Sequence, residues 1–239
     1  MALQVDVRDF ENIQDMVKQA MQRYKRLDVL VYNSGAVWWS SVENSPMKRF
    51  RLMQSVNPEG LYGCVQACLP YLHRNGENGE GRIVVISPPV YSRFLRGKTA
   101  YAMGKWAMSA LTMGLAMDLQ REGRSDMAIT SLWPAAVCFA WEAGRMYRLV
   151  TDRYTSQAIE SAATQNPQTD RSQLRKPAIF SDAILAILKA PVKDVNGRCL
   201  LDEDYLRETG MTDFAKYALV PGSTPVSYTH LTLPTTPYV

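Results

Sequence analysis

The chain has 239 residues, of which 46% are hydrophobic, 27 are Lys or Arg and 23 are Asp or Glu. This length suits one α/β domain with a buried core. The formal charge of +4 comes without the run of like charges that is typical of a nucleic-acid-binding arm. No apolar stretch approaches the ~20 residues of a membrane span. We therefore expect a soluble protein that binds neither nucleic acid nor a membrane.

The hydrophobic pattern predicts strands that alternate with helices. Asp9 is the expected cap of the first helix, and Ser45-Pro46 is expected to open the second with Ser45 as cap and Pro46 at the first helical position. In chain order the expected elements are a strand at 2–7, a helix at 10–24, a strand at 29–31, a helix at 45–74, a strand at 83–86, a helix at 99–121, a strand at 127–133, a helix at 182–189 and a strand at 199–201.

This order of elements predicts the α/β fold class. The β-branched run Ile83–Ile86 is typical of a strand that is buried on both faces of a parallel sheet. Alternating βα units indicate a Rossmann-type doubly wound sheet, in which ligands bind beyond the carboxyl ends of the strands. The segments that follow those ends, at 33–36, from Ser87 onward and from Pro134 onward, are therefore the candidate site.

One helix carries the residue pair with the clearest chemistry. Tyr101 and Lys105 are four residues apart, so they lie on one face of the predicted helix. A phenol can deliver a proton to an alkoxide that develops on hydride transfer, and a nearby Lys cation lowers the pKa of a Tyr. The competing interpretation is an exposed helix pair. Only two histidines occur, which argues against Ser-His-Asp and Cys-His catalysis.

Several segments from residue 1 to 134 together resemble the short-chain dehydrogenase/reductase family. They are Asp6-Val7 after a strand, Asn33-Ser34-Gly35, Asn57, the strand that ends in Ser87, and Tyr101 with Lys105. Within the family, the chain is most similar to the hydroxysteroid dehydrogenase-like subgroup and its fungal members. That similarity rests on Ile86-Ser87-Pro88-Pro89 and on 212–217.

The resemblance implies an oxidoreductase that moves a hydride between NAD or NADP and a small alcohol or carbonyl substrate. By this resemblance, Tyr101 would be the general acid/base. Lys105 would lower the pKa of Tyr101 and hold the nicotinamide ribose. Ser87 would bond the substrate oxygen, with Ser92 as its substitute, and Asn57 would support a proton relay. The residues implied to contact the cofactor are Asp6, Val7, Asn33, Ser34, Gly35, Tyr101, Lys105 and Pro134; no metal is expected.

Two local features add to this expectation. Pro58 follows Asn57 inside a predicted helix, so a distortion should free backbone groups there, although a simple kink is the alternative. Trp38 and Trp39 follow the Asn-Ser-Gly turn and can line a substrate pocket, although plain packing is as frequent.

The sequence also departs from the family. The Gly-rich turn that holds the pyrophosphate is missing, and residues 1–7 correspond to the family's third strand, so the sheet is expected to lack its first two strands. We expect one incomplete domain at 1–225 that binds dinucleotide weakly. Within it, 137–157 reads as an insertion, either a translated intron or a substrate lid, and 226–239 as a non-native or disordered tail.

Other expectations stay general. An inactive fragment that acts only as an interaction partner is the alternative to an enzyme. Cys64 and Cys68 are expected to be apolar filler rather than a metal or redox pair. Cysteine usage favours the cytoplasm, whereas the resemblance also allows a peroxisome or mitochondrion. By resemblance the intact parent is a homodimer or homotetramer.

Overall fold

The centre of the fold is a sheet of four strands in the order β1-β2-β3-β4. The strands are β1 (Val29–Tyr32), β2 (Gly81–Ile86), β3 (Met127–Trp133) and β4 (Cys199–Leu201). The first three pair in parallel, with Leu30 opposite Ile83 and Ile83 opposite Ile129. The predicted α/β parallel sheet is thus confirmed. This computed structural model describes residues 1–72, 80–88, 95, 97–133, 172 and 174–225.

The chain divides into two compact units. The first comprises Met1–Trp133 with Ile187–Leu200, and the second Pro134–Ala186 with Leu201–Val239. Helical elements of the first unit are α1 (Phe10–Tyr24), α2 (Met47–Gln54), the π-helical turn η1 (Ser55–Glu59), α3 (Gly60–Leu72), α4 (Thr99–Arg121) and α6 (Val192–Val195). The predicted insertion 137–157 and the tail 226–239 lie outside the described residues.

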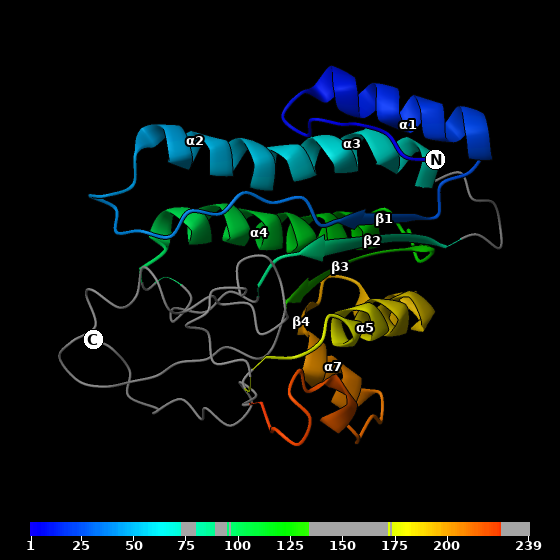
Figure 1. Cartoon of the computed structure of the whole chain (residues 1–239). Helices are drawn as coiled ribbons and strands as arrows, with labels where there is room; N and C mark the ends of the chain where they lie inside the picture. Colours follow the sequence, from blue (N-terminus) through cyan, green and yellow to red (C-terminus); the bar gives the residue numbers. More distant parts are fainter. Residues whose placement is uncertain (73–79, 89–94, 96, 134–171, 173, 226–239) are drawn as a thin grey trace. The chain divides into compact units, whose positions relative to one another are not determined.

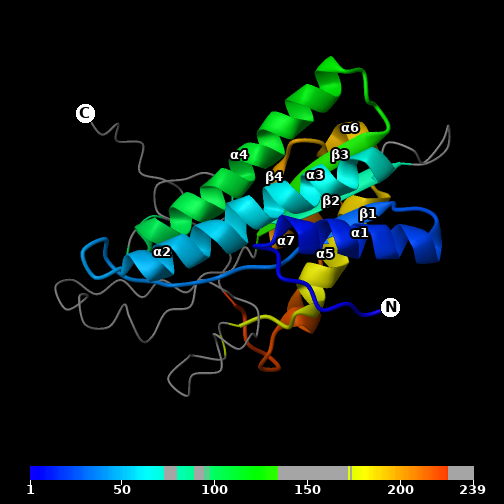
Figure 2. The ribbon, with the colours of Figure 1, turned by 90° about the horizontal axis from the view of Figure 1, so that it is seen from above.

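Helices α1, α3 and α4 cover one face of the sheet, with α3 between the other two (Figures 1 and 2). Apolar side chains between these helices and the strands form the core. They are Ile13, Val17, Tyr32, Leu61, Cys64, Val65, Cys68, Leu72, Ile83, Val85, Met108, Ala116, Leu119, Met127 and Ile129. Burial raises the pKa of Cys64 to about 11 and that of Cys68 to about 12, so both remain protonated thiols inside this core.

The opposite face of the sheet contacts the end of the same unit. Thr130 Oγ1 donates a hydrogen bond of 2.8 Å to the carbonyl of Val195, and Arg82 donates one of 2.8 Å to the carbonyl of Ala190. All six positions of β2 are buried as a result. A central strand covered on both faces explains the unbroken β-branched run that the sequence has there.

The start of α1 follows local capping. The Asp9 carboxylate accepts hydrogen bonds from the amides of Glu11 and Asn12, as predicted for an N-cap. The cap of α2 was expected one residue too early, because Pro46 occupies that position and the Ser45 hydroxyl donates instead to the carbonyl of Ser41. Helix α4 has the predicted bounds.

The expected strand at 2–7 is wrong. This segment is not hydrogen-bonded as a strand, because the sheet in the described residues ends at β1 and offers it no neighbouring strand. Val29 and Val31 of β1 are correspondingly exposed. In the described part of the chain, no helix combines the length and the apolar character that a membrane crossing requires.

The second unit contains α5 (Ala178–Lys189), which continues into the first unit, α7 (Asp202–Glu208) and the 3₁₀ turn η5 (Ala215–Tyr217). Helix α5 starts four residues before its predicted beginning, directly after Pro177. A buried ion pair between Arg175 and Glu203 joins the segment before α5 to α7. The hydroxyl of Tyr217 donates to Asp182, so α5 and η5 are also connected.

Candidate active site

Helix α4 carries the two residues that the sequence singled out, and both are buried. Tyr101 and Lys105 are each 4% exposed. Lys105 Nζ donates a hydrogen bond of 2.7 Å to the carbonyl of Ile86, the last residue of β2, and lies 6.0 Å from the centroid of the Tyr101 ring. The pair therefore lies at the carboxyl end of a central strand, which excludes the exposed helix pair.

Burial decides the protonation of this pair. Desolvation raises the pKa of the Tyr101 phenol above its ordinary value and lowers the pKa of Lys105 to about 7. Desolvation therefore dominates the pKa of Tyr101, and the effect that the sequence predicts for Lys105 on this phenol stays a prediction. The phenol therefore keeps its proton at neutral pH.

Ser87 directly follows β2, and the carbonyl groups of the residues on either side of it accept hydrogen bonds from side chains of α4. Lys105 binds the carbonyl of Ile86, and Ser109 Oγ donates a hydrogen bond of 2.6 Å to the carbonyl of Pro88. The Ser87 side chain is fully buried, and its hydroxyl has no hydrogen-bond partner in the described part of the chain. Buried hydroxyls nearly always have a partner, so the Ser87 hydroxyl departs from the usual pattern, as does that of Ser131.

Asn57 lies in η1, where the helix widens from α to π geometry around Pro58. The predicted distortion is therefore confirmed. The Asn57 side chain is fully buried and forms two hydrogen bonds with Ala36: its oxygen accepts from the Ala36 amide at 2.8 Å, and its nitrogen donates to the Ala36 carbonyl at 3.0 Å. Asn57 thus fixes the segment that follows β1.

A second contact stabilises the widened turn. The hydroxyl of Tyr32, the last residue of β1, donates to the carbonyl of Val56 within η1. Gly60, the first residue of α3, passes so close that a Cβ there would lie 2.5 Å from that hydroxyl and 2.9 Å from the carbonyl of Val7. The position of Asn57 therefore depends on a glycine and a tyrosine that sequence reasoning did not single out.

The Asn33-Ser34-Gly35 turn is exposed and begins directly after β1. A Cβ on Gly35 would lie 3.5 Å from Asn57 Oδ1 and 3.7 Å from Lys105 Nζ. The turn, Asn57 and Lys105 are thus brought together at the carboxyl ends of β1 and β2, where a parallel sheet places its ligands.

Aromatic side chains surround the buried pair. The Trp39 ring meets the Tyr101 ring edge to face, with centroids 6.3 Å apart. Lys105 Nζ lies 5.5 Å from the centroid of the Trp133 ring, at the end of β3. Trp39 therefore contacts the candidate acid, whereas the contact with Trp133 was not anticipated, because no spacing rule links residues from separate strands and helices.

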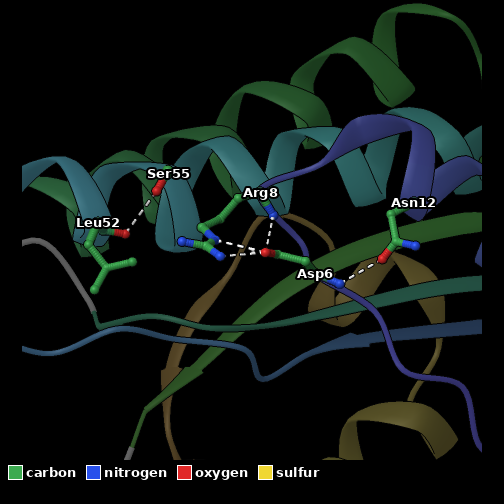
Figure 3. A network of polar contacts seen from close by, with 5 residues as sticks. All are labelled: Asp6, Arg8, Asn12, Leu52 and Ser55. Carbon is green, nitrogen blue, oxygen red and sulfur yellow. Dashed lines mark hydrogen bonds and ion pairs between the residues drawn. The ribbon is translucent and has the colours of Figure 1, made fainter.

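Asp6 and Val7 are arranged differently from the other candidates. Figure 3 shows the exposed Asp6 carboxylate bound by the Arg8 guanidinium and backbone amide, while the Asp6 amide donates to Asn12. The hydrogen bonds from Arg8 lower the pKa of Asp6 to about 2. Val7 lies beside Gly60. The Asp6 carboxylate, which the resemblance implies to contact the cofactor, thus already binds a neighbouring cation.

The remaining candidates, Ser92 and Pro134, lie outside the described residues. Neither Tyr101 nor Lys105 lines the surface hollow of about 490 Å³ between α1 and α3 or the one of about 570 Å³ beside Arg8 and α2. No group of three or more His, Cys, Asp or Glu side chains that could hold a metal ion is found among the residues with described positions.

A parallel sheet whose strand ends carry a buried Tyr-Lys pair defines a Rossmann-type α/β protein with a candidate redox site. The chain belongs to the short chain dehydrogenase family, whose family model matches residues 1–139. This is a family of oxidoreductases, and the expected membership is confirmed.

Comparison with individual proteins agrees with this assignment. The chain is 32% identical over 220 residues to hydroxysteroid dehydrogenase-like protein 2 of Rattus norvegicus, which confirms the predicted subgroup. That match covers 91% of this chain and 37% of the rat protein, so the chain spans well under half of this relative's length.

Solved structures share the fold. A short chain dehydrogenase of Mycobacterium thermoresistibile has a TM-score of 0.75 and 29% identity, covering 93% of this chain and 71% of that one. A 3-ketoacyl-(acyl-carrier-protein) reductase of Brucella melitensis, complexed with NADH, has a TM-score of 0.66 over 84% of this chain and 76% of its own. Its identity is 16%, so that likeness concerns the fold alone.

Proposed function

We propose that this chain carries the catalytic centre of an NAD(P)-dependent oxidoreductase that interconverts an alcohol and a carbonyl. The observation that carries the proposal is the convergence of Tyr101, Lys105, Asn57 and the unpartnered Ser87 hydroxyl at the carboxyl ends of β1 and β2. Tyr101 and Lys105 come from α4, Asn57 from η1 and Ser87 from the segment after β2, so three separate parts of the chain supply the site.

Tyr101 acts as the proton donor when the carbonyl is reduced. Its raised pKa keeps the phenol protonated at neutral pH, so a proton is available for an oxygen that gains negative charge. Ser87 donates its hydroxyl hydrogen to the same oxygen and so fixes the carbonyl near the phenol. Asn57 acts indirectly, by holding the segment at Ala36 through two hydrogen bonds.

The site fits the nicotinamide end of a dinucleotide. Gly35 lies next to Lys105, where a Cβ would be 3.7 Å from Nζ, so a ribose hydroxyl bound beside this turn would accept from that ammonium while the backbone of 33–35 borders the ring. When bound, the reduced nicotinamide supplies the hydride. Membership of the short chain dehydrogenase family supports this cofactor class.

We further propose that this chain binds the dinucleotide weakly. The Asp6 carboxylate, which the resemblance implies to contact the cofactor, is already engaged by Arg8. We therefore expect the proposed catalytic side chains to act as described while the affinity of this chain for the dinucleotide is low.

Turnover and cofactor binding can be separated with Tyr101→Phe. The assay follows the oxidation of NADH and NADPH by a panel of carbonyl compounds. It is run on this chain and on a chimera in which the Gly-rich strand, turn and helix of a family member are fused in front of this chain. Activity in either protein should fall by at least about 10²-fold in Tyr101→Phe, the lower bound for a lost general acid, while cofactor affinity changes little. No activity in both parent proteins would favour the alternative, an inactive fragment that serves as an interaction partner.

A further inference from the structure

A cationic and aromatic cluster lies beside Tyr101, on the side away from Lys105 along α4. Lys98 Nζ lies 5.4 Å from the centroid of the Trp39 ring. That ring in turn meets the Tyr101 ring at an interplanar angle of 71°. Lys98 directly precedes α4 and Tyr101 is three residues further on, so one helical turn connects the ammonium to the candidate acid.

The charge of Lys98 is held in a poorly solvated position. Partial burial lowers the pKa of Lys98 to about 8, so the ammonium is still mostly protonated at pH 7. A desolvated cation gains more from an approaching anion than an exposed one does, because less water screens the interaction.

The neighbouring indoles offer further contacts. The Arg49 guanidinium lies 4.8 Å from the centroid of the Trp38 ring, so both tryptophans carry a cation over one face. Their indole N–H groups are buried and have no hydrogen-bond acceptor among the described residues. Buried donors in native proteins usually find an acceptor, and a ligand with oxygen atoms would provide one.

We propose that the substrate of this site is a carbonyl compound with a carboxylate at its far end, which binds Lys98 while its apolar body packs against Trp39. The inference rests on the proposed function, because it places the reacting carbonyl next to Tyr101. The carboxylate takes no part in the reaction and selects the substrate by its charge.

Two probes that differ only in that charge test the proposal: 4-acetylbenzoate and its methyl ester share the same aryl ketone. Binding of each to the full chain is measured at pH 7 by isothermal titration calorimetry. We expect the acid to bind at least about tenfold more tightly than the ester, the ratio that a charge-assisted hydrogen bond supplies. Lys98→Met should remove the preference, and Lys98→Arg should retain it.

The matched control is Lys18→Met, an exposed lysine of α1 that should leave the preference unchanged. Equal binding of acid and ester to the wild-type chain overturns the proposal, as does a preference that survives Lys98→Met. Detectable binding of neither probe also overturns it. Reduction of the methyl ester reports on the proposed function separately: charge-dependent binding without turnover of either probe supports the anion site and contradicts the catalytic function.

Discussion

Gly60→Ala is expected to destabilise the chain strongly, even though alanine favours helices. Gly60 is the first residue of α3, and its Cα faces both β1 and the segment at Val7. The added Cβ would lie 2.5 Å from Tyr32 Oη and 2.9 Å from the carbonyl oxygen of Val7. One of these is a backbone atom, and the other is held by its hydrogen bond to Val56 in the widened turn. The methyl group therefore forces a shift of Tyr32, of the backbone, or of both.

The magnitude follows from three contributions. Overpacking costs about 1–3 kcal/mol, and loss of the Tyr32–Val56 hydrogen bond leaves a carbonyl unsatisfied at about 1–3 kcal/mol. Higher helix propensity of alanine offsets about 1 kcal/mol of this. The free energy of unfolding should therefore fall by about 1–5 kcal/mol, and activity should fall with it because Asn57 moves.

Urea unfolding monitored by tryptophan fluorescence measures this change, and Gly114→Ala is the matched control. Gly114 lies within α4, and a Cβ there would meet nothing within 4 Å. The control should raise the free energy of unfolding by up to about 1 kcal/mol through helix propensity alone. If Gly60→Ala were also stabilising, the close packing of α3 against Tyr32 would be refuted.

Two further outcomes are expected from the charges. The folded-state pKa of Lys105, about 7, lies below its unfolded value, so the unfolded chain binds more protons between pH 7 and about 10 and stability rises with pH across that window. Lys105→Met should lower the slope of the free energy of unfolding against pH by on the order of 1 kcal/mol per pH unit. Urea unfolding at several pH values measures this slope, and an unchanged slope would contradict the burial of the ammonium. Asp9→Ala should cost about 1 kcal/mol by removing the cap of α1, whereas Asp9→Asn should keep most of it. Equal losses in the two Asp9 variants would contradict the capping role.

Local sequence signals were sufficient for much of the fold. The bounds of α4 and β3 were predicted correctly, since an unbroken apolar pattern and clear ends define them. The π-turn around Asn57 was anticipated from Pro58, because proline removes an amide within a helix. The strand at 2–7 was expected from its apolar composition, yet a strand also needs a neighbour for its hydrogen bonds.

The candidate site was predictable in its parts and less so in its contacts. Tyr101 and Lys105 follow from helix spacing, but the hydrogen bond from Lys105 to Ile86 joins residues 19 positions apart. The raised pKa of Tyr101 was not anticipated, because a short-range pairing rule ignores the desolvation that the folded core imposes. The roles of Trp133 and Gly60 depend on tertiary packing, which no local pattern encodes.

Transfer of deuterium from a cofactor to a carbonyl carbon tests the central claim most directly. The chain is incubated with NADH or NADPH deuterated at the hydride-donating carbon and with methyl 4-acetylbenzoate, and the alcohol product is analysed by mass spectrometry, which detects slow turnover. We expect deuterium at the carbinol carbon with the wild-type chain and at least about 10²-fold less with Tyr101→Phe. No labelled alcohol from the wild-type chain, or equal labelling by both proteins, would contradict the account.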